Sequence, residues 1–390
     1  MSDACTDDAI ATLLDPVTFD DFRSRWRDRR PLHVARADRE HFATLASVEA
    51  IEQLLSVQPL FFPQLQLSRA AEPIAKADYS DESGRIVAPR LMQHHANGAT
   101  IVLSHAQERL PALASLCRGL EAGFGVRCQA NVYLSPPGQQ GFAPHYDSHD
   151  VFILQVAGAK RFSFYAGGPT LPLAGDRFDP ARCSPGNKSL ELLLEAGSTL
   201  YIPRGVMHDA VAEERMPSLH ITVGTFAPTV LDALQGALQI AASRDTRLRQ
   251  ALDPAADTDI DELRGMLGAL LDEQALRESL TALHDETALA ARADVTGSSA
   301  RSRRAATLSD TSRIRRRDGA LWSVERDGDA LHLRTAGAVL DCRSRLADAV
   351  HGLIEAGELD IASLPGDDAD ERLALARRLI EENLAEPMPG

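Results

Sequence analysis

The chain has 390 residues, of which 44% are hydrophobic and 25% charged, so its length allows roughly two or three globular domains. Its formal net charge of −15 argues against general attraction to nucleic acid or to an anionic membrane. The charge would suit a basic partner, but many soluble enzymes are simply acidic, which is the favoured interpretation. The five cysteines are odd in number and never paired as CxxC, which indicates reduced thiols. Because no signal peptide or membrane-length apolar run is present, we expect a cytoplasmic protein.

Residues 1–57 show helical periodicity in FDDFRSRW and SVEAIEQLL, with RRPLHVA between them as a short strand. From about residue 60 to residue 228, short β-type runs alternate with Gly and Pro, which predicts an antiparallel barrel or sandwich. These runs are TIVLSH, ANVYLS, DVFILQV, KRFSFY, LELLLE, STLYIP and SLHITVGTF.

Residues 229–300 return to helical periodicity, and a small α+β unit forms the C-terminal end. Between them lies a Ser/Arg-rich boundary, the one feature that favours nucleic acid. It nearly lacks aromatic residues for base stacking, so a solvated linker is the favoured interpretation. Its arginines are Arg301, Arg303, Arg304, Arg313, Arg315, Arg316 and Arg317.

The segment PHYDSHDVFILQV contains an HxD pair, His145 and Asp147. On a strand, positions i and i+2 point to the same face, so both side chains can reach one metal ion. A second such pattern, His284-Asp285-Glu286, lies in a helical stretch, where these positions point roughly 200° apart. We therefore interpret His145 and Asp147 as metal ligands, and His284 with Glu286 as part of a solvated face.

The segment GSTLYIPRGVMHDAV supplies a third ligand, His208. Its spacing, G-x5-P-x-G-x2-H from Gly197 through Pro203, resembles the second motif of the cupin barrel, although Ala212 stands where that motif usually has Asn. Two imidazoles and one carboxylate leave three positions of an octahedral metal open, as Fe(II) requires to bind a bidentate 2-oxo acid and then O2. The alternative is a set of satisfied polar core residues.

Three further polar residues lie near these motifs. In the strand that follows Asp147, Asp150 faces away from His149, so at most one of the two could join the site. We interpret His149 as a supporting or structural residue. His220, on the last strand, could line the pocket as an alternative ligand or a substrate contact, and it ranks below His208 because it lacks the cupin spacing.

Lys160 begins the run KRFSFY, in which Lys160, Phe162 and Phe164 share one face. An inward lysine beside two phenylalanines is costly unless it meets an anion, and a pocket for a 2-oxo dicarboxylic acid needs such a cation. Periodicity alone leaves equally open that Lys160 belongs to a turn and that Arg161 simply faces solvent.

From about residue 18 to its end, the chain resembles the JmjC ribosomal oxygenases, which hydroxylate histidine or arginine side chains of ribosomal proteins. The segments that carry the resemblance are FDDFRSRWRDRRPLHV, NVYLSPPGQQGFAPHYDSHDVFILQVAGAKRF, YIPRGVMHDAV and SLHITVGTF. It implies a mainly β catalytic domain, a double-stranded β-helix of the cupin/JmjC type, with Fe(II) on His145, Asp147 and His208.

The resemblance also implies a co-substrate pocket. Lys160 matches the basic residue that pairs with the far carboxylate of 2-oxoglutarate, and Asn131 and Tyr133 match positions that line the pocket. Where relatives carry a serine on the last barrel strand, this chain has Gly224. A hydroxyl is then missing from the pocket, unless a neighbouring threonine replaces it; the candidates are Thr222 and Thr225.

The implied architecture has three parts: a catalytic domain with N-terminal helices over residues 1–228, an α-helical dimerisation domain over 229–300, and a winged-helix-like α+β domain over 301–390. The length and apolar stripe of the helical part also favour a homodimer.

The leading functional hypothesis is hydroxylation of a His or Arg side chain in a ribosomal protein or other polypeptide, with Fe(II), 2-oxoglutarate and O2. A related possibility is tailoring of a precursor peptide for a natural product. The alternatives from other classes are a metal-binding cupin without catalysis and a winged-helix regulator with a cupin sensor. Nothing in the sequence suggests the aromatic cage of a lysine demethylase.

Overall fold

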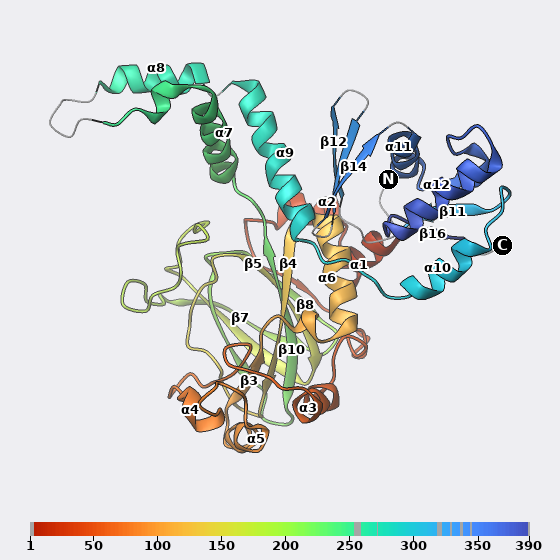
Figure 1. Cartoon of the computed structure of the whole chain (residues 1–390). Helices are drawn as coiled ribbons and strands as arrows, with labels where there is room; N and C mark the ends of the chain where they lie inside the picture. Colours follow the sequence, from red (N-terminus) through yellow and green to blue (C-terminus); the bar gives the residue numbers. More distant parts are fainter. Residues whose placement is uncertain are drawn as a thin grey trace. The chain divides into compact units, whose positions relative to one another are not determined.

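The computed structural model describes residues 4–252, 259–270, 272–317, 322–327, 330–335, 338–343 and 345–388. The chain divides into two compact units, residues 1–123 with 128–226, and residues 124–127 with 227–390 (Figure 1). The predicted boundary after residue 228 lies two residues beyond this division. The further division at residue 300 stays a prediction.

The first unit is built on two sheets that pack together as a double-stranded β-helix, as predicted. Their facing sides form an apolar core that includes Ile153 and Leu200 from the larger sheet and Phe162, Phe164 and Leu194 from the smaller one. The larger sheet has the order β1 (Leu32–Val34), β8 (Thr199–Ile202), β5 (Asp150–Ala157), β10 (Ser218–Phe226), β4 (Arg127–Ser135), β3 (Thr100–Leu103) and β2 (Leu65–Ser68). The smaller sheet has the order β7 (Lys188–Glu195), β6 (Ala159–Tyr165) and β9 (Met207–Ala212).

Helices and short helical turns accompany these sheets. They are α1 (Ala4–Leu14), α2 (Phe19–Arg25), α3 (Val48–Val57), α4 (Lys76–Tyr79), α5 (Ala88–Ala96), η1 (Ala106–Glu108) and α6 (Pro111–Phe124). The helices of residues 1–57 were predicted. The expectation of purely β-type runs from residue 60 onward was wrong for α4, α5 and α6. Helix α6 buries Leu113, Leu116 and Leu120, whose spacing of three and four residues is helical.

Two glycines turn the chain on either side of β8 and so deliver β9 to the barrel. Gly197 has φ +81°, and a Cβ there would lie 1.9 Å from the carbonyl oxygen of Asp38. Gly205 has φ +83°, and a Cβ there would lie 2.0 Å from the carbonyl oxygen of Pro169. Both positions therefore require glycine, for the left-handed backbone and for the close approach of another segment.

The second unit begins with three helices, α7 (Val230–Arg244), α8 (Ile260–Leu270) and α9 (Glu273–Ala290), with the short turn η2 (Thr246–Arg249) after the first. Helices α7 and α9 pack closely through small residues: a Cβ at Gly236 would lie 2.2 Å from Ser279 Oγ, and that hydroxyl donates a hydrogen bond to the carbonyl oxygen of Ala233. The three leucines of α7 lie elsewhere on the helix and remain exposed.

The rest of the second unit combines two three-stranded sheets with further helices. Its elements are α10 (Ser298–Ala306), β11 (Arg313–Arg316), β12 (Trp322–Asp327), β13 (Ala330–Thr335), β14 (Ala338–Arg343), α11 (Arg345–Ala356), β15 (Glu358–Asp360), η3 (Ile361–Ser363), α12 (Ala369–Glu381) and β16 (Ala385–Pro387). Ile314 of β11, Val350 of α11 and Leu379 of α12 are fully buried in one apolar core. The helical and α+β parts follow the predicted order along the chain.

The arginine-rich segment is not a solvated linker, because most of it forms α10 and β11. Arg313 pairs with Glu358 at 2.7 Å, and Arg315 with Glu386 at 2.6 Å. Arg317 is buried and hydrogen-bonded to Asn383. Carboxylates thus neutralise part of the positive charge that would be needed to attract nucleic acid.

Across the described ranges, no helix combines the length and apolar character needed to cross a bilayer.

Replacing Gly197 with Ala is expected to lower the free energy of unfolding by at least about 1–2 kcal/mol. The left-handed conformation alone costs an L-residue about that much, and the contact with the Asp38 carbonyl adds to it. Chemical denaturation would measure the change. Gly175→Ala is the control, because it has a negative or extended φ and nothing within 4 Å of the added methyl group. Equal midpoints for the two variants would contradict this account.

Candidate metal centre and its cavity

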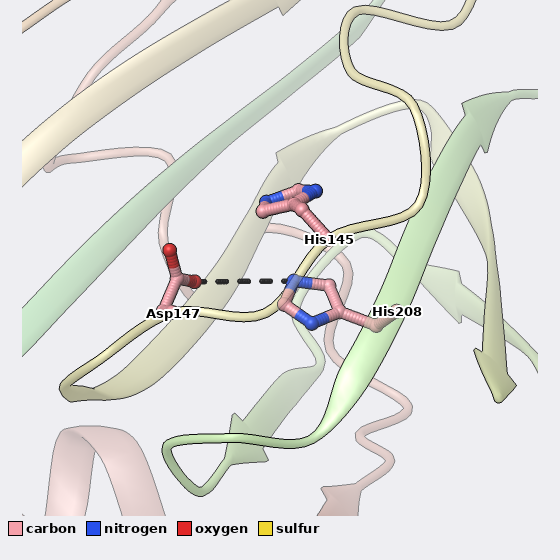
Figure 2. Close-up of side chains that lie close together, drawn as sticks. All are labelled: His145, Asp147 and His208. Atoms are coloured by element: carbon pink, nitrogen blue, oxygen red, sulfur yellow. Dashed lines mark ion pairs between the residues drawn. The ribbon is translucent and has the colours of Figure 1, made fainter. Parts of the chain in front are cut away.

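The structure brings together the three residues predicted as metal ligands (Figure 2). His145 and Asp147 lie in the loop that precedes β5, and His208 is the second residue of β9. One ligand atom from each side chain lies within 4.8 Å of the others. Asp147 Oδ2 and His208 Nε2 are 4.0 Å apart, too far for a hydrogen bond, so both atoms remain available to an ion.

The backbone fixes this arrangement. The amide of His145 donates to the carbonyl oxygen of His208 at 3.0 Å, and the amide of His208 donates to the carbonyl oxygen of His145 at 2.8 Å. The amide of Gly205 donates to the carbonyl oxygen of Asp147 at 2.9 Å. The loop that carries two ligands is thus fastened at two points to the segment that carries the third.

Both imidazoles are oriented by backbone carbonyl groups. His145 Nδ1 lies 2.9 Å from the carbonyl oxygen of Ala143, and His208 Nδ1 lies 2.9 Å from that of Val206. Because a carbonyl oxygen only accepts, each Nδ1 carries the proton and each Nε2 is left for a metal ion, the usual arrangement around metal-bound histidines. Burial, and then the nearby His145, lower the pKa of His208, which favours the neutral imidazole.

A cavity of about 250 Å³ adjoins the three ligands. Most of the exposed area of its wall is apolar, although eight of the fourteen lining residues have polar side chains. The lining residues are Thr100, Tyr133, Gly141, Phe142, His145, Asp147, Val151, Ile153, Lys160, Phe162, His208, Ala210, His220 and Thr222. A small, mostly apolar cavity with convergent polar groups is typical of a small-molecule site.

Lys160 lies in the wall of this cavity and is 4% exposed. Of the two orientations left open by the sequence, the structure has the inward one: Lys160 and Phe162 face the interior, while Arg161 lies outside and pairs with Glu213 at 2.8 Å. Burial lowers the pKa of Lys160 to about 7, and no carboxylate among the described residues offsets that effect. A buried ammonium group without an anion predicts an anionic ligand.

Of the two residues matched on β4, Tyr133 lines the cavity. Burial, and then the nearby Asp147, raise its pKa to about 12, so the phenol keeps its proton. Asn131 lies two residues earlier on the same strand, outside the cavity lining, and its side-chain oxygen accepts hydrogen bonds from the His105 amide at 3.1 Å and from Gln129 at 3.0 Å. A co-substrate contact by Asn131 stays a prediction.

The glycine on the last barrel strand has a local explanation. A Cβ at Gly224 would lie 2.8 Å from the His149 ring, which also stacks on Phe226. His149 thus occupies the space of a side chain at position 224. Thr222 lines the cavity, whereas Thr225 directs its hydroxyl to the backbone of Asp150, so Thr222 is the threonine able to supply the missing hydroxyl.

Asp150 does not join the ligand group. Its carboxylate accepts hydrogen bonds from the Tyr201 hydroxyl at 2.7 Å and from the Arg204 amide at 3.0 Å. Burial raises the pKa of Asp150 despite these contacts. The residue therefore fastens the start of β5 to the segment that leads to His208.

The second HxD/E pattern also falls outside the site. His284 and Glu286 are exposed on α9, as predicted. Asp285 is different, because it pairs with Arg334 at 3.1 Å and accepts a hydrogen bond from the Ser323 hydroxyl. It is a structural contact between α9 and the strands that follow.

Thr100 and Phe142 are among the lining residues that sequence reasoning missed. Phe142 is 39% exposed and lies against His145, with ring centroids 5.8 Å apart, so it connects the cavity with the surface. The sequence did offer a signal for Phe142, because it is an aromatic residue three positions before the first ligand, in a loop that contains glycines. Thr100 stands at the start of β3 and gave none.

Comparison with known proteins identifies the fold. The JmjC domain family matches residues 102–233, the stretch that contains all three ligands. This chain contains a JmjC domain. Over 258 residues it is 34% identical to the "Bifunctional lysine-specific demethylase and histidyl-hydroxylase NO66" of Drosophila grimshawi, an alignment that covers 62% of this chain and 34% of that protein. The NO66 protein of Dictyostelium discoideum is 29% identical over 68% of this chain and 56% of its own length.

The JmjC domain and the parts that follow it also resemble solved structures. Escherichia coli ycfD matches with a TM-score of 0.56 and 18% identity, over 95% of this chain and 98% of its own. The ycfD ribosomal oxygenase in complex with cobalt and 2-oxoglutarate matches with a TM-score of 0.53 and 18% identity, over 96% and 99% of the two chains. At this identity the likeness shows a shared fold. The chain spans only about a third to a half of the length of the NO66 proteins it matches.

The residues of the JmjC domain fit Fe(II) and a 2-oxo dicarboxylic acid. Two imidazole Nε2 atoms and one carboxylate form the donor set of non-haem Fe(II) sites, with open positions on the metal. Lys160 in the same cavity offers a positive charge to the far end of the acid.

Replacing Lys160 with Met is expected to stabilise the ligand-free protein at pH 7 and below, by on the order of a few kcal/mol. The folded pKa of Lys160, about 7, lies below its ordinary value of 10.5. The unfolded chain therefore binds more protons between these values, so wild-type stability rises with pH across that window. The advantage of K160M should shrink over the same window.

Chemical denaturation between pH 6 and 10 would measure this difference. Lys188→Met is the control, because Lys188 is exposed and paired with Glu191 at 2.8 Å. A stability difference between wild type and K160M that does not change with pH would contradict a buried, unpaired ammonium group.

Proposed function

We propose that this protein is an Fe(II)- and 2-oxoglutarate-dependent oxygenase that hydroxylates a side chain of a polypeptide. One observation carries the proposal: the cavity beside the three ligands also holds a buried lysine without an anionic partner among the described residues. A metal site alone gives no reason for a buried lysine at position 160. A 2-oxo dicarboxylate does, because its 2-oxo acid end can meet a metal ion while its other carboxylate meets an ammonium group.

In this proposal His145, Asp147 and His208 hold Fe(II), and Lys160 pairs with the far carboxylate of 2-oxoglutarate. Bound Fe(II) would supply the reaction with O2 that an unactivated C–H bond requires. Tyr133, which keeps its proton, can donate a hydrogen bond to the co-substrate.

The apolar wall has a chemical role of its own. Val151, Ile153 and Phe162 line the same cavity as Lys160 and are themselves buried. In this low-dielectric setting, the attraction between the ammonium group and a carboxylate is stronger than it would be in water. The exposed edge of Phe142 marks the side from which a substrate side chain would reach the site.

For the target, we propose a histidine or arginine of a ribosomal protein. The similarity to a histidyl-hydroxylase and to a ribosomal oxygenase supports this choice. The net charge of −15 suits the basic character of ribosomal proteins. The free cysteines, Cys117, Cys128, Cys183 and Cys342, fit a reducing, cytoplasmic location.

We also propose a homodimer formed through α7. Val230, Leu231, Leu234 and Leu238 are 79%, 39%, 42% and 37% exposed, and the last three recur at helical spacing along one side of α7. Within the chain, α7 packs on α9 through small residues such as Ala237 instead. A stripe of exposed leucines is expected to be covered by a second copy.

Replacing His145 or Asp147 with Ala is expected to reduce succinate formation from 2-oxoglutarate at least roughly a hundredfold, since even residues that only support metal ligands contribute 10–100-fold. The assay contains Fe(II), and mass spectrometry of ribosomal proteins should show a gain of 16 Da that depends on the wild-type protein.

His284→Ala is the matched control, because it removes the histidine of the second HxD/E pattern and should leave turnover unchanged. Full turnover in H145A and D147A would refute the assignment. Metal binding without any effect of 2-oxoglutarate on the melting temperature would favour a metal-binding cupin without catalysis.

The double substitution Leu234→Glu with Leu238→Glu is expected to convert a dimer to a monomer, because two charges would have to be buried at the contact. Light scattering coupled to size-exclusion chromatography would give the mass in solution. Val57→Glu, at a 76% exposed position of α3, is the control and should leave the mass unchanged. A wild-type protein that elutes with the mass of one chain would contradict the dimer.

A further inference from the structure

His220 is a buried polar residue in the cavity wall to which neither the fold nor the metal centre assigns a role. It is 6% exposed, and its Nδ1 atom has no hydrogen-bond partner in the described part of the chain. A buried polar nitrogen left unpaired costs roughly 1–3 kcal/mol, so such atoms are rare in folded proteins. Because His220 also lines the cavity, a ligand bound there is a candidate partner for the imidazole.

The fold holds this ring in place. The imidazole stacks on Tyr133, with ring centroids 4.7 Å apart and an interplanar angle of 2°. The pairing of β10 with β5 shifts register between Leu219 and His220. Such irregularities re-aim side chains and occur often beside active sites. The position of the ring is therefore set before a ligand arrives.

His220 is not a fourth metal ligand, because the ligand group consists of His145, Asp147 and His208. Its charged neighbour is instead Lys160, which lines the same cavity. Burial first, and then the positive charge of Lys160, lower the pKa of His220 well below its ordinary value. The ring is accordingly neutral, with one N–H to donate, and it lies near a cation that has no anionic partner among the described residues.

We propose that His220 donates a hydrogen bond to the same carboxylate that pairs with Lys160. The two side chains would then form a clamp for the far end of the co-substrate. Lys160 supplies the positive charge, His220 supplies a directional hydrogen bond, and Tyr133 fixes the plane of the His220 ring. This inference rests on the proposed use of 2-oxoglutarate. Its consequence is selectivity: the clamp favours 2-oxo acids with a second carboxylate over those without one.

The test uses the full-length protein loaded with Mn(II), which does not support turnover, and titration calorimetry with two acids. 2-Oxoglutarate has the far carboxylate, and 2-oxobutyrate has the same 2-oxo acid group without it. His220→Phe keeps a flat ring on Tyr133 but removes the N–H. We expect H220F to bind 2-oxoglutarate roughly ten- to a hundredfold more weakly, the loss typical of a hydrogen bond to a charged group. Its affinity for 2-oxobutyrate and for Mn(II) should stay within about threefold of wild type.

Two further variants test the donor itself. His220→Asn places an amide N–H near the position of Nδ1, and His220→Gln places one near that of Nε2. Recovery of 2-oxoglutarate affinity in either one supports the proposal and identifies the nitrogen. Melting temperatures without ligand show whether each variant folds.

Two results would overturn the inference: unchanged 2-oxoglutarate affinity in H220F, or an equal loss for both acids, which would indicate a merely structural role. Absence of 2-oxoglutarate binding by the wild-type protein would overturn the proposed function itself, together with the clamp that depends on it.

Discussion

The paired backbone hydrogen bonds between His145 and His208 join two segments that lie far apart in the sequence, and the metal centre depends on them. They fix the separation of two ligands without any contribution from the side chains. A third bond, from the Gly205 amide to the Asp147 carbonyl, adds the remaining ligand to the same frame. The side chains then need only their Nδ1 contacts to be oriented, so the site is organised before an ion binds.

The same constraint explains the glycines around β8. For β9 to run beside the ligand loop, the chain must turn sharply at Gly197 and Gly205, both of which have a left-handed backbone in contact with another segment. Asp150 also stabilises this arrangement, because its carboxylate accepts a hydrogen bond from the Arg204 amide at the start of the turn that precedes His208. The spacing of Gly, Pro and His in this motif therefore reflects how closely three backbone segments approach one another.

Much of the fold could be predicted because short β-type runs separated by Gly and Pro indicate strands and the turns between them. Strands β3, β4, β5, β8 and β10 of the larger sheet and strands β6 and β7 of the smaller sheet correspond to such runs. Strand β9 of the smaller sheet was not recognised, since MHDAVA contains the polar residues His208 and Asp209, which are both buried. Helices α4 and α5 were missed because they are short and each buries a single residue, Tyr79 and Leu91, which is too few to show a helical spacing. Helix α6 could have been found from its apolar spacing.

The residues of the site also differ in how far the sequence could predict them. His145, Asp147 and His208 were predictable because strand parity and motif spacing are local properties of the sequence. The orientation of Lys160 was not, since periodicity shows that Lys160 and Phe162 share a face but not which face is inside. The unpaired Nδ1 of His220 and the fit of His149 over Gly224 depend on what surrounds them in space, and no pattern along the chain reports that.

The charged groups that line the cavity therefore restrict which ligands it can bind. The lining of the cavity contains both the three ligands and the buried ammonium group of Lys160, and its apolar residues strengthen the electrostatic attraction of these groups to a bound ligand. Without a ligand, this arrangement is destabilising, as the lowered pKa of Lys160 indicates. An anion that neutralises the charge binds only the folded state and so stabilises it. A dicarboxylic 2-oxo acid can bind the metal ion and the ammonium group at the same time, whereas a monocarboxylic acid leaves the ammonium group buried and unpaired.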